Sequence, residues 1–196
     1  MPKKDYYIKE ISKAQCKDLL IKYHYLSKIS RGFKTKFNYG LFYKEDADPC
    51  GVCIFTGFPV PELSKGMLGL EREDQDGLFE LSRLCLEPYH QSTEHNLSSW
   101  FVANCIKRLK NQTDVRVILS YADSDFHSGT VYKALGFDYY GLTDPKKDFW
   151  IKQSDGSYKK HSRGKIKGME GEWRDRSRKH RFVKVFDKNL EVKWEI

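Results

Sequence analysis

Long hydrophobic runs are missing from this sequence. None approaches the roughly 18 apolar residues that a helix needs to cross a bilayer, and the opening stretch MPKKDYYIKE has no apolar core of the length found in signal peptides. We therefore expect a soluble, cytoplasmic protein that does not associate with membranes.

Cysteine is sparse: the chain of 196 residues has five, an odd number. They are scattered through apolar surroundings, which argues against a disulfide framework and for reduced, mostly buried thiols. Cys50 and Cys53 do read CxxC, but no second CxxC or HxxxH supplies the further ligands that zinc requires. The sequence therefore predicts no metal site, and Cys53 is expected to be an ordinary strand residue.

Apolar residues are plentiful enough for a real core, at 39% of the chain with twelve Phe and twelve Tyr. The charge is distributed unevenly. Residues 1–150 carry 21 Lys and Arg against 20 Asp and Glu, whereas residues 151–196 carry 14 against 7. We expect a folded domain over residues 1–150 and a basic extension over residues 151–196 that packs on the domain or continues it.

Apolar periodicity predicts alternating strands and helices, and hence an α/β fold with a mixed sheet. The predicted strands cover residues 6–12, 38–45, 51–58, 78–87, 115–123, 137–143 and 148–161, and the predicted helices cover residues 13–26, 96–112 and 128–135. Residues 59–77 are expected to be a long loop, and residues 179–196 a closing hairpin around DKN. Asn96 is the expected N-cap of the second helix. Alternation in 78–87 places Phe79, Leu81, Arg83 and Cys85 on one face.

The order of elements over residues 6–143 resembles the GNAT acyltransferase fold, and VYKALGF (131–137) looks like the end of its last conserved section. That fold usually holds the pyrophosphate of coenzyme A on a glycine-rich turn at a helix N-terminus. The corresponding connection here, EPYHQSTEHNLSS (87–99), contains no glycine. The resemblance therefore implies a GNAT-like fold without the usual acetyl-CoA signature.

Four motifs in the same order resemble the Mom family of phage DNA-modification proteins, a GNAT-like group: YHYLS (23–27), FELSRLCLE (79–87), NLSSWF (96–101) and LSYADSDFHSGTVYKALGF (119–137). The resemblance implies transfer of a carbamoylmethyl group to adenine N6 in double-stranded DNA, which protects phage DNA from restriction in the host cytoplasm. A glycine-derived or aminoacyl donor, with tRNA as one candidate carrier, is favoured over acetyl-CoA. Iron would suit such chemistry, but no ligand spacing specifies it.

By resemblance, the functional positions are His24, Tyr25, Arg83, Ser99, Asp123 and Tyr132. Arg83 lies within an apolar strand, where a guanidinium is costly to bury, so we expect it either to pair with a carboxylate such as Asp123 or to bind a substrate anion. Asp123 ends a central strand, at the sheet edge where ligands collect. It is expected to hold the amine of adenine or accept its proton, or else to cap the next helix, a role that Asp125 and Ser128 fit better by position.

The other positions each keep two interpretations. Tyr132 would be a general acid to the leaving group, or a packing tyrosine. Ser99 would bind the group donor together with Asn96 and Ser120, or only cap its helix. His24 and Tyr25 would line the cleft opposite the donor, although a half-buried structural His24 is equally consistent with the sequence.

The basic stretch 159–181 has ten Lys and Arg against three acidic residues, with Trp173 among them. Such a concentration can neutralise phosphates, although many charge runs are only solvated faces. The loop at 28–36 would extend the same track. The residues expected to bind nucleic acid are Lys34, Lys36, Lys165, Lys167, Arg174, Arg176, Arg178, Lys179 and Arg181. A paired adenine has to be flipped out of the duplex, with Phe33, Phe37 or Trp100 as stacking surfaces.

Two alternatives compete with this hypothesis. The first is an acyl-CoA-dependent N-acyltransferase that acts on a protein or a small amine. The second is a nucleic-acid-binding protein that keeps the fold without catalysis.

Overall fold

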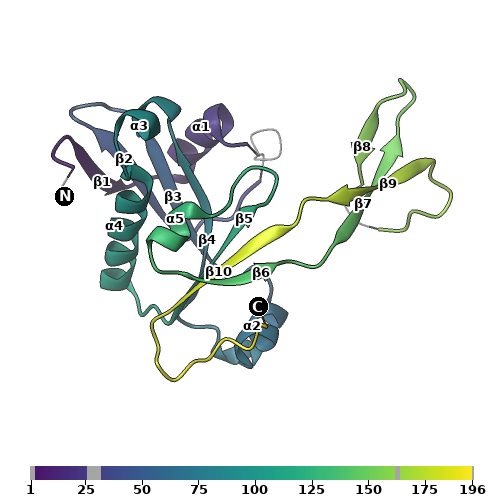
Figure 1. Cartoon of the computed structure of the whole chain (residues 1–196). Helices are drawn as coiled ribbons and strands as arrows, with labels where there is room; N and C mark the ends of the chain where they lie inside the picture. The colour runs from purple at the N-terminus through teal and green to yellow at the C-terminus, as the bar shows by residue number, and fades with distance from the viewer. Residues whose placement is uncertain (1–2, 26–31, 162–163, 196) are drawn as a thin grey trace.

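A seven-stranded sheet forms the body of the protein, in the order β1-β2-β3-β4-β5-β10-β6 (Figure 1). The computed structural model describes residues 3–25, 32–161 and 164–195. The strands of this sheet are β1 (Tyr6–Glu10), β2 (Phe37–Tyr43), β3 (Gly51–Gly57), β4 (Leu78–Leu86), β5 (Val117–Asp123), β6 (Asp138–Leu142) and β10 (Lys179–Val185). Only β4 and β5 pair in parallel; the other neighbours in this described sheet are antiparallel. The predicted mixed α/β class is confirmed.

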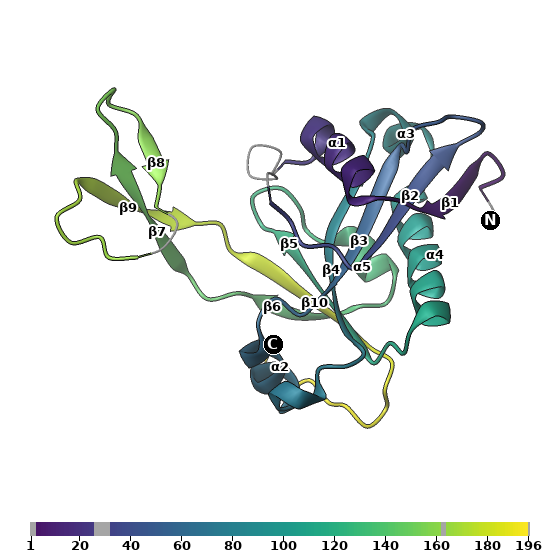
Figure 2. The same ribbon diagram turned by 180° about the vertical axis from the view of Figure 1, so that it is seen from behind.

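Helices cover both faces of the sheet (Figures 1 and 2). They are α1 (Lys13–Tyr23), α2 (Pro61–Leu68), α3 (Pro88–Thr93), α4 (Leu97–Gln112), α5 (Thr130–Ala134) and the 3-10 turn η1 (Arg72–Asp74). The largest core cluster lies between the sheet and α4 with α5, where Phe55, Phe101 and Phe182 are fully buried. On the opposite face, α1 and α2 each cover a smaller apolar cluster. No helix in the described ranges is long and apolar enough to cross a membrane.

The first helix begins where the sequence predicts. Ser12 and Gln15 form a capping box: the Gln15 N–H donates to Ser12 Oγ at 3.3 Å, and the Ser12 N–H donates to Gln15 Oε1 at 3.0 Å. These bonds satisfy backbone donors that a helix leaves unpaired at its start. Helix α1 ends at Tyr23, which leaves His24 and Tyr25 just beyond its last turn.

A bulge in β4 decides which side chains face which core. Pairing with β3 shifts at Ser82, which is skipped between Leu81 and Arg83. One extra residue inverts the alternation of side chains beyond it. Leu81 therefore packs beneath α4, whereas Cys85 packs against α1. The predicted single face with Phe79, Leu81, Arg83 and Cys85 is wrong for this reason.

The two parallel strands separate immediately after the bulge. Pairs between β4 and β5 run from Leu78 with Val117 to Leu81 with Ser120. Residues 82–86 and 121–123 lie past the last pair. The sheet is therefore split between its two central strands at this end.

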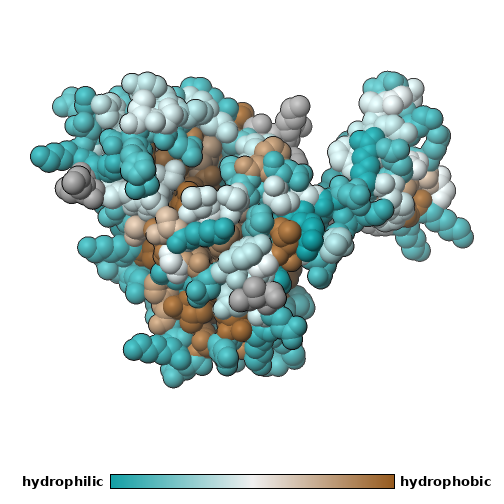
Figure 3. Space-filling model, viewed as in Figure 1, coloured by the Kyte–Doolittle hydropathy of each residue, from teal (hydrophilic) through white to brown (hydrophobic). Residues whose placement is uncertain are grey.

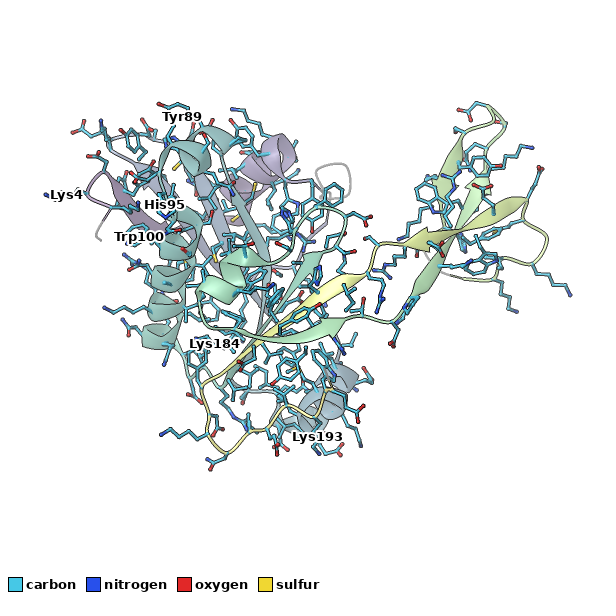
Figure 4. The ribbon with its side chains drawn as sticks, in the orientation of Figure 1. Lys4, Tyr89, His95, Trp100, Lys184 and Lys193 are labelled. Atoms are coloured by element: carbon cyan, nitrogen blue, oxygen red, sulfur yellow. The ribbon has the colours of Figure 1, made fainter. Side chains whose placement is uncertain are left out.

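Two other sequence predictions are also wrong. The expected loop at 59–77 contains α2 and η1, and α2 covers the apolar cluster that includes Met67 and Leu119. The expected closing hairpin around DKN does not form. Residues 179–185 instead form β10, inserted between β5 and β6, and the segment after β10 runs back to α2, where Lys193 lies (Figure 4).

A second, three-stranded sheet projects from the body as an arm, clearly separate in both views (Figures 1 and 2). Its strands are β7 (Lys146–Lys152), β8 (Tyr158–Lys160) and β9 (Gly171–Arg176), with β7 in the middle. In the chain, the arm lies between β6 and β10, which are neighbours in the main sheet. Both ends of the arm therefore attach to the same part of the body.

The arm has a small core of its own. The Arg174 guanidinium lies over the rings of Trp150 and Tyr158, 4.8 and 4.6 Å from their centroids. Phe149 and Trp173 meet edge to face. The rest of the arm's visible surface is mostly hydrophilic (Figure 3). Cation–π and aromatic contacts thus hold the strands together with little apolar burial.

Candidate active site

A cleft of about 500 Å³ opens where β4 and β5 separate. Its walls come from the end of α1, from β4 beyond the bulge, from the start of α4 and from the segment between β5 and α5. The lining includes four of the predicted residues, His24, Tyr25, Arg83 and Tyr132. The split in the sheet thus brings together segments that are far apart in the sequence.

Arg83 lines this cleft without a carboxylate partner among the described residues. Its Nη1 donates to the carbonyl oxygen of Ser82 at 2.5 Å. The ion pair with Asp123, one of the two predicted alternatives, is not formed, because Asp123 is bound by Lys179 instead. A guanidinium has five N–H donors. Arg83 therefore keeps donors that can bind an anion or a developing negative charge in the cleft.

His24 is a neutral imidazole at physiological pH. Burial lowers its pKa to about 4, and its electrostatic interactions with Arg83 and His127 act in the same direction. The next residue, Tyr25, stacks on the His24 ring. Burial also raises the pKa of Tyr25, so its phenol stays protonated.

Asp123 lies at the end of β5 but is occupied by other groups of the protein. Lys179 Nζ and Ser177 Oγ both bind its Oδ2, at 2.5 and 2.9 Å, and the Asp125 N–H donates to its Oδ1 at 3.2 Å. Burial by itself raises the pKa of Asp123, but these hydrogen bonds outweigh it and hold the pKa below its usual value. Asp123 is therefore a carboxylate at neutral pH that ties the base of the arm to the end of β5.

Tyr132 and Ser120 lie deeper, under the α5 side of the cleft. Burial raises the pKa of Tyr132 to about 12, so its hydroxyl carries a proton across the physiological range. Ser120 is fully buried, and its Oγ donates to the carbonyl oxygen of Leu81 at 3.0 Å. Ser120 therefore links β4 to β5 at their last pair.

At the start of α4, the structure places Ser98 in the cleft rather than Ser99. The Ser99 hydroxyl donates to the carbonyl oxygen of Asn96 at 3.1 Å. Asn96 is the N-cap by position, but its backbone is left-handed, at φ 56°, and its side chain makes no capping hydrogen bond. The predicted N-cap position is therefore confirmed, although no side-chain cap forms there. Asp125 and Ser128 do not cap α5, whose N-cap is Gly129, without a side-chain bond.

Several polar and aromatic residues of the cleft were not foreseen from the sequence as parts of one site, among them Ser98, Tyr121, Phe126 and His127. Phe126 is 58% exposed and stacks on Tyr25 with ring centroids 4.6 Å apart. Its only signal in the sequence is an aromatic residue within the polar joint after β5. Phe33, one of the predicted stacking surfaces, is 8% exposed in the core beneath α1.

The nine basic residues predicted to bind nucleic acid fall into two groups. Five are exposed. Lys34 and Lys36 lie just before β2, and Lys165, Lys167 and Arg176 lie on the arm. Four are partly buried and bound within the protein: Arg174 by its two aromatic rings, Arg178 by the Thr143 carbonyl oxygen, Lys179 by Asp123 and Arg181 over Trp194. Part of the YHYLS motif and parts of both basic segments lie outside the described residues, at 26–31 and 162–163.

The cysteines are all free and buried, as expected. Burial raises the pKa of Cys50 to about 12, which keeps its thiol protonated. Within the described ranges, no three His, Cys, Asp or Glu side chains gather as a metal site. The connection from β4 to α4 holds α3 and no glycine, so it lacks the backbone cradle that usually binds the pyrophosphate of coenzyme A.

Comparison with known proteins agrees with this geometry. A model of the Mom protein family matches residues 5–195. No match was found among curated protein sequences.

Solved structures of acetyltransferases share the fold. The ribosomal-protein-S18-alanine N-acetyltransferase from Escherichia coli is 11% identical, with a TM-score of 0.53, over 95% of this chain and 99% of that chain. A Bacillus subtilis acetyltransferase in complex with CoA is also 11% identical, with a TM-score of 0.53, over 92% and 97%. Arabidopsis thaliana NAA60 in complex with acetyl-CoA is 8% identical, with a TM-score of 0.53, over 92% and 98%. At these identities the likeness defines the fold, which is the GNAT acetyltransferase fold.

Proposed function

The chain belongs to the Mom protein family, and we propose that it is a transferase that attaches a small glycine-derived group, carbamoylmethyl, to N6 of adenine in double-stranded DNA. Such a modification would protect the DNA of a bacteriophage from host restriction. The acetyltransferase fold supports transfer of a small group to an amine as the general reaction.

One observation carries this proposal. All four motifs of the family resemblance contribute residues to a single cleft: Tyr25 from the first, Arg83 from the second, Ser98 from the third and Tyr132 from the fourth. Motifs that only maintained the fold would have no reason to converge on one hollow.

The charges in the cleft suit a reaction in which negative charge develops. N6 of adenine forms a bond to the methylene carbon of the donor as the bond from that carbon to the leaving group breaks. The leaving group departs with the electron pair and is protonated, and N6 gives up a proton to solvent. Among the described residues that line the cleft, Arg83 is the cation, and the neutral His24 does not compete for anions. N–H donors aimed at a developing negative charge lower the barrier most where water is excluded.

Tyr132 is the best-placed proton donor to the leaving group. Its pKa of about 12 keeps the phenol protonated until the leaving group needs a proton. Asp123 is assigned a positioning role, since its carboxylate is held by Lys179 and Ser177 and it is absent from the lining of the cleft within the described residues.

DNA is the proposed partner of the basic arm. The exposed Lys165, Lys167 and Arg176 lie on the arm, which joins the body beside Asp123. Contacts to phosphates at the arm would hold the duplex without reading its sequence. For the donor, α3 in place of a glycine-rich turn supports a glycine-derived or aminoacyl donor, tRNA included, over acetyl-CoA.

Mass spectrometry of nucleosides tests the proposal. Plasmid DNA from cells that express the wild-type chain should contain a modified deoxyadenosine heavier by the carbamoylmethyl group, and DNA from cells that express Arg83→Ala should not. Lys107→Ala, on the exposed side of α4, is the matched control and should keep the product. Absence of any new deoxyadenosine with the wild-type chain, together with acetyl-CoA binding by calorimetry, would favour a conventional acyl-CoA transferase.

A further inference from the structure

Three aromatic rings stack from the inside of the cleft to its rim. The rings of His24 and Tyr25 lie 4.4 Å apart at 23°, and those of Tyr25 and Phe126 lie 4.6 Å apart at 26°. Exposure rises along the stack, from 8% at His24 to 37% at Tyr25 and 58% at Phe126. All three residues line the cleft. The stack therefore ends in an exposed aromatic ring at the mouth of the site.

The turn that carries Phe126 is held in place by its backbone. The N–H groups of Phe126 and His127 both donate to the carbonyl oxygen of Asp123, at 3.0 and 2.8 Å. The Asp123 side chain is in turn bound by Lys179 and Ser177 at the base of the arm. The turn that carries the ring is thus held in place before a ligand arrives, which lowers the entropic cost of binding.

A single exposed phenylalanine is common on protein surfaces and has no meaning alone. Phe126 differs because its ring continues a stack of nearly parallel rings, and because Arg83 lines the same cleft. A planar group that enters this cleft would extend the stack in a site that Arg83 also lines. The volume of about 500 Å³ is in the range of small-molecule sites, which a nucleobase with its sugar fits.

We propose that Phe126 is a stacking platform for the adenine base extruded from DNA, and that the stack of His24, Tyr25 and Phe126 orients this base toward Arg83. The inference rests on the proposed function and adds the residue that holds the base. It takes the place of the stacking surfaces expected from the sequence. Phe33 is buried, and Phe37 and Trp100 pack against the core.

The test compares two fluorescein-labelled duplexes by fluorescence anisotropy. One has an adenine opposite an abasic site, so that the base is unpaired and easily extruded; the other has abasic sites in both strands at that position. The wild-type chain should bind the adenine duplex about tenfold more tightly, as expected for one base stacked on an aromatic ring. Phe126→Ala should lose this preference, while its affinity for the abasic duplex stays unchanged. Phe126→Trp should keep the preference.

Tyr89→Ala is the matched control. Tyr89 is 68% exposed on α3, outside the lining of the cleft and far from the arm (Figure 4), so this substitution should leave both affinities unchanged. Equal thermal unfolding midpoints for the two alanine variants would show that both are folded.

The outcomes separate the platform from the chemistry. The proposed stacking role of Phe126 is overturned if the wild-type chain shows no preference for the adenine duplex or if Phe126→Ala keeps that preference. It is also overturned if Phe126→Ala lowers the affinity for both duplexes equally. If nucleosides from plasmid DNA show no modified adenine but Phe126→Ala abolishes the preference, the proposed function fails and the platform stands.

Discussion

His24 makes the stability of the protein depend on pH. Its folded pKa of about 4 lies below the ordinary value of 6.5, so protons bind the unfolded chain more tightly. Its stabilising contribution is therefore complete above pH 6.5 and is lost as pH falls toward 4. Between pH 7.5 and pH 5, the wild-type chain should lose about 2 kcal/mol more of its free energy of unfolding than His24→Asn. Urea unfolding of both proteins at the two pH values measures this difference; parallel losses would contradict it.

The pair formed by Asp123 and Lys179 should show strong coupling. The side chain of Asp123 is only 5% exposed, so Lys179→Met leaves a buried carboxylate without its ion-pair partner. We expect a loss of about 3 kcal/mol in the free energy of unfolding. The double variant Asp123→Asn, Lys179→Met should lose less than the sum of the two single variants, as measured by chemical denaturation. Additive losses would mean that the contact contributes no coupling energy.

At the scale of residues, the sequence was most informative where a polar side chain interrupts an apolar pattern. Arg83 stood out for this reason, and the structure places it in the cleft. Phe126 could not be identified in this way, since its significance comes from a ring contact with Tyr25, about a hundred residues away in sequence. Nothing in the local sequence shows that Lys179 would bind Asp123.

The arm has few contacts to the rest of the protein. We therefore expect it to be more mobile than the main sheet. Local opening is easiest where little apolar surface is buried. Amide hydrogen exchange should therefore be faster in residues 146–176 than in β5 and β10, which lie inside the main sheet. Removal of the stacked guanidinium by Arg174→Met should speed exchange further in the arm alone, because Trp150 and Tyr158 lose their shared partner.

Arm amides protected as strongly as those of β5 would contradict this expectation. Lys152→Met is the matched control, since its side chain makes a surface ion pair with Glu170. Such pairs contribute little to stability, so exchange in that variant should match the wild type.

At the scale of elements, most helices and strands follow from local patterns, whereas long-range pairing does not. The start of α1 and the antiparallel pairing of β2 with β3 follow from neighbouring residues. β10 looked like the first strand of a hairpin because DKN favours a turn, yet its partners are β5 and β6, made much earlier in the chain. The bulge at Ser82 likewise depends on pairing with β3, which the alternation within β4 alone does not show.

For the whole molecule, the uneven charge predicts how binding to DNA responds to salt. Each phosphate neutralised by a cation steepens the fall of affinity with salt by about 0.9 in logarithmic slope. Changing the exposed Lys165, Lys167 and Arg176 to Gln should reduce the slope by about 2 to 3. The slope is measured by anisotropy titrations of one duplex at several salt concentrations.

A matched triple substitution of exposed cations on α4, Lys107, Arg108 and Lys110 to Gln, serves as the control. Helix α4 lies on the opposite side of the body from the arm (Figure 1). This control substitution removes the same number of positive charges and should leave the salt slope nearly unchanged. Equal reductions in the two triple variants would mean that net charge, and not the arm, attracts the DNA.

Because β10 comes last in the chain, two strands of the main sheet are synthesised before the strand that pairs with both of them. β5 and β6 leave the ribosome before the arm, and each must wait for β10 to supply its hydrogen-bonding partner. Until then, β5 presents an unpaired edge rich in Val, Ile and Leu, the kind of surface that pairs with other chains. The arm's length therefore sets how long the nascent chain is exposed to misassembly, and slow translation through residues 146–178 would favour aggregation over folding.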